Sequence, residues 1–357
     1  MSIHIRGRDS NLDLVRSIAF LLVLAVHFLL NTGFYDTPSV GGRMLFGEIY
    51  RSFCLCCVPL FVVLSGYLLG EKVLSWKYYK GVLRILVTYL LASLACMAYQ
   101  VGVQGVSLTA GWVVTQLAFF RGAPYSWYVE MYLGLFLLIP FLNGMYKSLD
   151  TKKKKLALLV TLLLLSALPT ILCAHPMPDR WLNLWPVTYY IMGSYLREYP
   201  LRLPVWGMGT LFLIVAAADG VLWYRLNGGL PHVWHPISDW GGFGVAVATL
   251  LLFSLLRRVR TDLAPRWVQR GLGEISRLSF AAYLLSWIPD QVIYGFLNRA
   301  VPFMPDRFVY IPLTVGAAVL FSLILAWFVE WAVQKILVPL NRIGRSAPAI
   351  EPEKSIK

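Results

Sequence analysis

Long apolar runs recur along almost the whole of this 357-residue chain and are separated by short polar connections. A membrane-spanning helix needs roughly 20 predominantly apolar residues, and backbone groups in lipid must bond within their own segment. Ten candidate spans follow, the sixth being the shortest: 12–31, 46–70, 82–101, 128–146, 156–174, 183–196, 204–224, 240–256, 275–297 and 309–334. The sequence therefore predicts an all-α integral membrane protein with about ten transmembrane helices.

The composition agrees with a protein that lipid surrounds. Hydrophobic residues make up 58% of the chain and charged residues only 14%, against roughly 25% in an average soluble domain. The net charge of +14 can indicate nucleic-acid binding, but here the charges lie between the apolar runs and no nucleic-acid-binding motif accompanies them. The expected partner is the bilayer, and no nucleic acid is expected.

The distribution of basic residues predicts the orientation. Connections on one side of the ten spans carry 24 Lys and Arg residues, those on the other side carry 7, and Arg16 lies inside the first span. Under the positive-inside rule the richer side is cytoplasmic, so both termini are expected there. We expect one membrane domain over residues 1–340, a short disordered cytoplasmic tail over 341–357, and a multi-pass location in a plasma or bacterial inner membrane. The first run reads as a span rather than as a cleavable signal peptide.

Metal binding and disulfides are not expected. The five cysteines are Cys54, Cys56, Cys57, Cys96 and Cys173. They lie in apolar segments with neither zinc-ligand nor disulfide-framework spacing, so they are interpreted as packing residues. His232 and His235 share one outer connection, but no carboxylate or cysteine set completes a metal site.

Two ionisable residues in the first span need an explanation. Arg16 and His27 are eleven residues apart, which is about three helical turns, so they share one helix face at about 16 Å along the axis. Arg16 alone can extend to the headgroups or pair with Asp13, and His27 alone can bond to a neighbouring helix. Together on one face, they indicate a face turned toward the bundle interior or a water-filled cavity.

These residues belong to a pattern that resembles the acyltransferase family 3 of polytopic membrane O-acyltransferases. The strongest carriers are Arg-x10-His in LDLVRSIAFLLVLAVH and the second-span stretch VPLFVVLSGYLL. KYYKGVLRILVTYL, WYVEMYLGLFLLIPFL and LGEISRLSFAAYLL follow in the same order as in the family and extend the resemblance over most of the chain.

The resemblance implies transfer of an acyl group, most often acetyl, from cytoplasmic acyl-CoA to a hydroxyl of a cell-surface polysaccharide or lipid-linked glycan. It also implies that Arg16 and His27 are essential. A guanidinium binds phosphate in a bidentate manner and suits CoA, while an imidazole near the outer leaflet suits a general base. Their separation is similar to the span of a pantetheine arm, so this helix face is expected to line an acyl-CoA tunnel.

Further candidates are assigned to the two ends of that tunnel. Lys80 and Arg84 lie one turn apart at the cytoplasmic start of the third span, where they can hold CoA phosphates or simply follow the positive-inside rule. Trp127, Tyr128 and Glu130 open the fourth span near the outer face and are expected to bind the acceptor. Glu130 can orient His27, bind a sugar hydroxyl or simply be exposed.

Two motifs have less direct roles. Ser65, Gly66 and Tyr67 close the second span, where Gly66 permits close helix packing. The family often has Tyr-x-x-His in a late span, but this chain has Tyr283-Leu-Leu-Ser286, followed by Asp290. The role of the missing histidine cannot be carried over; Tyr283, Ser286 and Asp290 are expected near the acceptor, with Asp290 supplying polarity.

Two other function classes remain open. One is a transporter or flippase of a lipid-linked glycan. Broken helices and inverted repeats would indicate this class, and no repeat is evident in this sequence. A membrane sensor or scaffold has no need of His27, so replacement of that residue tells the classes apart.

Overall fold

The computed structural model describes residues 9–172, 179–234 and 239–343, and within them the chain is all-helical with no strand. Its α-helices are α1 (Ser10–Asn31), α2 (Gly41–Cys54), α3 (Cys57–Leu69), α4 (Trp76–Tyr79), α5 (Val82–Gln104), α6 (Ala110–Ala118), α7 (Trp127–Ser148), α8 (Lys152–Ser166), α9 (Leu168–Leu172), α10 (Trp185–Glu198), α11 (Val205–Asn227), α12 (Phe243–Leu256), α13 (Arg266–Leu285), α14 (Trp287–Ala300) and α15 (Ile311–Ile343). Short 3₁₀ turns are η1 (Asp179–Leu184), η3 (Thr261–Leu263) and η4 (Met304–Tyr310). The predictions made for Cys173, His235 and the tail beyond 343 fall outside the described residues.

Six segments of the described chain are long and apolar enough to cross a membrane: α1, α2 with α3, α4 with α5, α7, α11, and η4 with α15. The remaining predicted spans correspond to shorter or more polar helices, namely α8 with α9, α10, α12, and α13 with α14. The all-helical membrane architecture is thus confirmed, whereas the count of ten spans and the orientation stay predictions.

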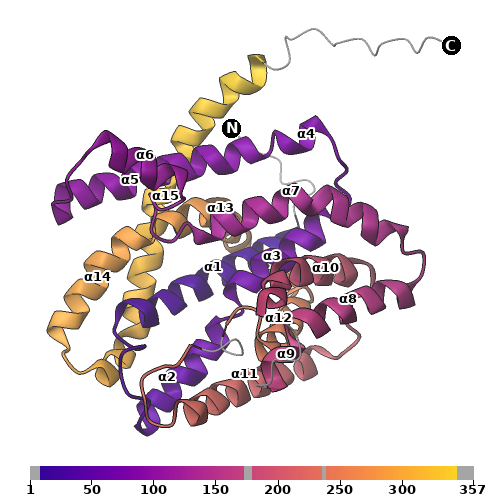
Figure 1. Ribbon diagram of the computed structural model, residues 1–357, viewed down its shortest axis with the longest axis horizontal. Helices are drawn as coiled ribbons and strands as arrows, with labels where there is room; N and C mark the ends of the chain where they lie inside the picture. Colours follow the sequence, from indigo (N-terminus) through magenta and orange to yellow (C-terminus); the bar gives the residue numbers. More distant parts are fainter. Residues whose placement is uncertain (1–8, 173–178, 235–238, 344–357) are drawn as a thin grey trace.

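The first and second spans form the centre of the bundle. In both, 67% of the most apolar window is buried, against 22% in α11 and 28% in α15. Figure 1 shows α1 and α3 in the middle of the view, with α5, α8, α11 and α14 around them. Helices that are buried on most sides carry the residues that a bundle can shield from lipid, and α1 is the helix that carries Arg16 and His27.

Two of the predicted spans are interrupted rather than continuous. The span predicted over 46–70 breaks at Leu55 and Cys56, and the span predicted over 275–297 breaks at Ser286. Each break comes just before a proline, Pro59 or Pro289, that lies three residues into the second helix. Proline has no N–H for the carbonyl four residues earlier and its ring crowds that carbonyl, so the helix kinks there. The sequence prediction did not include these breaks, because it counted apolar residues and not backbone donors; α2 with α3 still forms one segment long and apolar enough to cross a membrane.

The second half of the broken span, α3, packs closely on α10. A Cβ atom built on Gly66 would lie 1.9 Å from the carbonyl oxygen of Tyr190, and one built on Gly193 would lie 2.0 Å from that of Val63. Both glycines are therefore at the contact and let the two backbones touch, as small residues do between membrane helices. The packing role predicted for Gly66 matches this contact.

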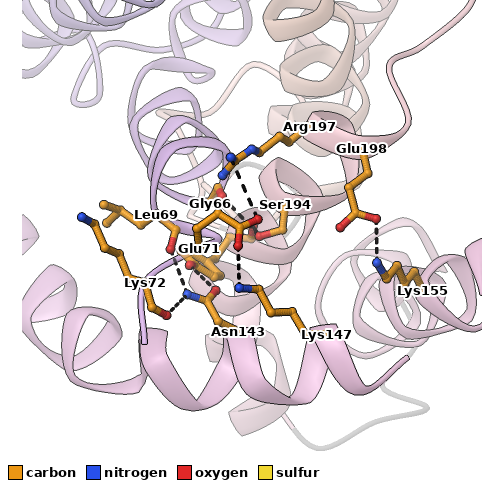
Figure 2. Close-up of polar contacts among 11 residues, drawn as sticks. Gly66, Leu69, Glu71, Lys72, Asn143, Lys147, Lys155, Ser194, Arg197 and Glu198 are labelled. Carbon is orange, nitrogen blue, oxygen red and sulfur yellow. Dashed lines mark hydrogen bonds and ion pairs between the residues drawn. The ribbon is translucent and has the colours of Figure 1, made fainter. Parts of the chain in front are cut away.

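Polar contacts hold the end of α3 against α7 and α10 (Figure 2). The side chain of Asn143 donates to the carbonyls of Leu69 and Lys72 at 2.8 and 2.7 Å. Lys147 pairs with Glu71 at 2.6 Å, and the hydrogen bond and charge of that lysine lower the pKa of Glu71. Carbonyl groups at and just after the end of α3 thus accept hydrogen bonds from a side chain of α7.

The most exposed tryptophans lie where helices begin on the predicted cytoplasmic side. Trp76, Trp206 and Trp267 open α4, α11 and α13, and each is 76% exposed. Tryptophan is enriched at membrane–water interfaces because its ring is apolar and its N–H is polar.

Candidate functional site

His27 lies on the last turns of α1 and its side chain is almost completely buried. The α13–α14 break faces it. Because the helix is interrupted at Ser286, this residue and Asp290, one turn further on, both approach the imidazole ring. The kink caused by Pro289 therefore contributes directly to the surroundings of His27.

The Nδ1 atom of His27 is the atom that these residues contact. It lies 3.0 Å from Oδ2 of Asp290 and 3.3 Å from Oγ of Ser286. The Ser286 hydroxyl donates to the carbonyl of Tyr283 at 2.8 Å, so toward the ring it acts as an acceptor. In a neutral imidazole, two acceptors at Nδ1 place the hydrogen on that nitrogen and leave the lone pair on Nε2.

Asp290 is held by a second donor. The hydroxyl of Tyr125 donates to Oδ2 of Asp290 at 3.0 Å and accepts a hydrogen bond from the side chain of Asn31 at 3.0 Å. The Tyr125 ring also lies against His27, with ring centroids 4.0 Å apart. Burial, and after it the Asp290 carboxylate, raise the pKa of Tyr125 well above its usual value. The hydroxyl therefore stays protonated and donates.

A cavity of about 450 Å³ runs along the same helix. Arg16 and Val23 line it, seven residues apart, and His27 follows Val23 by four residues. The cavity thus extends from the level of Arg16 to about one turn short of His27. The other lining residues are Val58, Phe61, Leu64, Ser65, Arg84, Ile85, Tyr128, Tyr132, Ser276, Arg277, Ser279, Phe280 and Tyr283.

One end of the cavity is cationic. Arg16 donates from Nη1 to the hydroxyl of Ser276 at 3.1 Å. Arg84 and Arg277 are each held by a carboxylate, Arg84 by Glu330 of α15 and Arg277 by Glu274 at 2.6 Å. Three guanidinium groups that converge on one cavity form a site suited to phosphate, because each presents several N–H donors in a planar fork.

The other end of the cavity is aromatic, and Tyr283 separates it from His27. Tyr283 lines the cavity, its ring centroid lies 6.3 Å from that of His27, and its hydroxyl donates to the carbonyl of Tyr125. Tyr128 stands edge-on to Tyr283 with centroids 5.9 Å apart. Cavity and imidazole are therefore neighbours with one aromatic ring between them.

The residues predicted for the site divide into two groups. Arg16, Arg84, Tyr128 and Tyr283 line the cavity, whereas Ser286 and Asp290 contact His27. Lys80, Trp127 and Glu130 do neither. Lys80 and Glu130 are exposed, and Trp127 stacks on Trp240 with ring centroids 5.8 Å apart.

Sequence reasoning did not single out Tyr125, Tyr132 or Arg277. Tyr125 lies in the aromatic outer connection GAPYSWY and Arg277 in the late basic stretch, and both patterns have ordinary explanations in a membrane protein. A cue for Tyr125 is its place two residues before the predicted acceptor residues, but only the fold brings it to Asp290.

No group of three metal-ligating side chains occurs within the described residues. The Nδ1 atom of His232 lies 3.3 Å from Oε1 of the buried Glu48, which also accepts from Asn227 at 2.8 Å and from Ser39 at 3.3 Å. This network joins the connection after α11 to α2 and lies apart from the cavity.

Comparison with known proteins identifies a family for most of the chain. The model of acyltransferase family 3, described as "Acyltransferase domain", matches residues 9–327, which is most of the sequence. No curated protein and no solved structure matches the chain.

Proposed function

The chain belongs to acyltransferase family 3, and from this premise we propose that it moves an acetyl group from cytoplasmic acetyl-CoA to a hydroxyl of a cell-surface polysaccharide or lipid-linked glycan. The observation that carries the proposal is the order of groups along α1. Arg16 lies at the cationic end of the cavity, Val23 lies within it, and the His27–Asp290 pair lies one turn beyond it.

The cationic end is the donor site in this proposal. Arg16, Arg84 and Arg277 bind the phosphates of CoA, and the aromatic part of the cavity takes the pantetheine arm and its acyl end. The donor supplies an acyl group activated as a thioester. Each arginine is already held, by Ser276, Glu330 or Glu274, so little side-chain freedom is lost on binding.

His27 is the general base. With its hydrogen on Nδ1 bound to Asp290, Nε2 takes the proton of the acceptor hydroxyl as the oxygen attacks the acyl carbon. A new ester C–O bond forms and the thioester C–S bond breaks. The proton held by His27 then passes to the thiolate, so CoA leaves as the thiol and the imidazole returns neutral.

Asp290 is a positioning residue in this scheme. Its carboxylate fixes the ring orientation and stabilises the imidazolium that forms, and Tyr125 and Ser286 complete its surroundings. The residue that follows the late-span tyrosine by three is here Ser286 and not the histidine frequent in the family. We assign to Ser286 the role of accepting a hydrogen bond from Nδ1 of His27.

Mass spectrometry of surface glycans tests the function. Cells with the intact protein should carry glycans heavier by one acetyl unit per modified sugar than cells without it, and His27→Asn should give the lighter form. Isotopically labelled acetyl-CoA supplied to inside-out membrane vesicles should place the label on the glycan. Identical glycans in all three strains would refute the proposal.

A lipid-linked glycan transporter is the second candidate, because α2–α3 and α13–α14 are interrupted helices of the kind that transporters use at their binding sites. One of these interruptions faces His27 with a carboxylate, which group transfer requires and transport does not. A transporter would change the amount of glycan at the surface on loss of the protein, with no change in its acetyl content.

A further inference from the structure

Arg307 is a buried cation in η4 without a carboxylate partner among the described residues. An ionised side chain at this depth is costly unless several hydrogen bonds hold it. Its guanidinium instead donates to backbone carbonyls only, and those carbonyls belong to two different helix ends.

One of these ends is that of α1. The Nη1 atom of Arg307 donates at 2.5 Å to the carbonyl of Thr32, the C-cap residue that follows α1. Gly33 follows with a φ of +73°, in the left-handed region that commonly terminates helices. The chain therefore turns away at this point and leaves the Thr32 carbonyl to an outside donor.

The other end is that of α14. The Nε atom of Arg307 donates to Val301 at 2.7 Å, and its Nη2 atom donates to Pro302 at 2.9 Å and to Asn298 at 3.3 Å. The side chain of Asn298 also reaches across and donates to the carbonyl of Asn31 at 2.9 Å. Carbonyls at helix C-termini carry partial negative charge, so one cation stabilises both ends together.

The helices joined in this way are the two that carry His27 and Asp290. His27 lies five residues before Thr32 on α1, and Asp290 lies eight residues before Asn298 on α14. We propose that Arg307 is a positioning residue for the His27–Asp290 pair, which sets the register of α1 against α14 from their common end. The inference rests on the proposed function, since it assigns Arg307 a share in the reaction through His27.

Arg307→Lys tests the geometry of the guanidinium group separately from its charge. Arg307→Lys keeps the charge, but one ammonium group cannot serve four carbonyls in the geometry of a planar fork. A misplacement of about 1 Å in a reacting group can cost about 10²-fold in rate. We expect kcat for acetyl transfer to fall by roughly 10- to 100-fold, with the KM for acetyl-CoA and the membrane level of the protein unchanged. The matched control is Arg299→Lys on the exposed side of α14, where the arginine donates only within its own helix.

A double-mutant cycle separates positioning from general stabilisation. If Arg307 acts through the pair, adding Arg307→Lys to an Asp290→Asn protein should cost little further activity, whereas independent structural damage should multiply with the first loss. Radiolabelled acetyl-CoA provides the sensitivity to measure the residual rates. Multiplicative losses, or a fully active Arg307→Lys protein beside an inactive His27→Asn protein, would overturn the inference and leave the acyltransferase proposal intact.

Hydrogen exchange supplies a readout that needs no activity. Loss of the Arg307 hydrogen bonds should speed amide exchange in peptides that cover the ends of α1 and α14, while exchange in peptides from α3 and α10 should be unchanged. Unaltered exchange at both helix ends in Arg307→Lys would refute the proposed role of Arg307 in holding them, even if the protein proved to be a transporter.

Discussion

The Nδ1 atom of His27 and the Oδ2 atom of Asp290 lie 3.0 Å apart, although 263 positions separate the two residues in the chain. Both side chains are buried, and the carboxylate is not exposed at all. A histidine whose Nδ1 binds a buried carboxylate presents Nε2 in a defined direction. In the proposed function, His27 is the general base and Asp290 orients its ring.

Asp290→Asn should lower kcat by roughly 10²- to 10⁴-fold, the range of a general base's contribution, because an amide can hold the ring in the wrong tautomer and cannot balance an imidazolium. The KM for acetyl-CoA should be unchanged. Ser286→Ala is the matched control on the same ring nitrogen, and its longer contact of 3.3 Å predicts a loss of only a few-fold. Equal losses in the two proteins would contradict the special role of the carboxylate.

His27→Asn and His27→Gln should both abolish glycan acetylation while the protein accumulates in the membrane at the normal level. Both side chains keep hydrogen-bonding capacity but neither takes up a proton near neutral pH. Immunoblots of membranes and mass spectrometry of glycans give the two measurements. An active asparagine or glutamine protein would show that His27 only joins helices and that another group is the base.

Arg16→Lys should raise the KM for acetyl-CoA by about tenfold, which corresponds to about 1.4 kcal/mol of lost binding. Lysine keeps the charge but cannot form two parallel hydrogen bonds to one phosphate. Lys80→Ala provides the control, because Lys80 is exposed and does not line the cavity. A normal KM in Arg16→Lys would indicate that Arg16 reaches the headgroups instead of the donor.

Gly66→Ala should destabilise the protein by about 1–3 kcal/mol, as overpacking in a dense interior does. The added Cβ would lie 1.9 Å from a backbone oxygen of α10, which no side-chain rotation can relieve. Thermal unfolding in detergent measures the loss. Gly144→Ala in α7 is the comparison, since a Cβ there meets nothing within 4 Å, and its melting temperature should be unchanged or higher.

A cysteine at Lys153 should react with a membrane-impermeant maleimide only after the membrane is opened. The prediction follows from the excess of basic residues in the connections on that side. Cys54, Cys56, Cys57 and Cys96 are all buried, and the experiment uses a Cys173→Ser background so that labelling reports the introduced cysteine. Labelling from outside intact cells would show that the topology is the reverse of the predicted one and that His27 lies near the cytoplasm.

The membrane class and most helix positions were predictable from the sequence, because hydropathy is a local property and each lipid-facing helix satisfies its own backbone. The starts of α1, α5, α7 and α11 lie within two residues of their predicted positions. The breaks at Cys56 and Ser286 were not predicted, although Pro59 and Pro289 mark them in the sequence. A count of apolar residues is insensitive to a single missing N–H.

Arg16 and His27 stood out from the sequence alone, since an ionisable residue in an apolar run is costly and their spacing put both on one face of one helix. Their partners could not be found in this way. Whether His27 is met by Glu130 or by Asp290, and whether Lys80 or Arg277 joins Arg84 at the cavity, depends on how separate helices rotate and slide against one another. Contacts between helix ends that are distant in sequence, such as the carbonyls of Thr32 and Asn298 that Arg307 joins, belong to this packing. Local sequence determined which residues each helix carries, and only tertiary packing decided which of them meet.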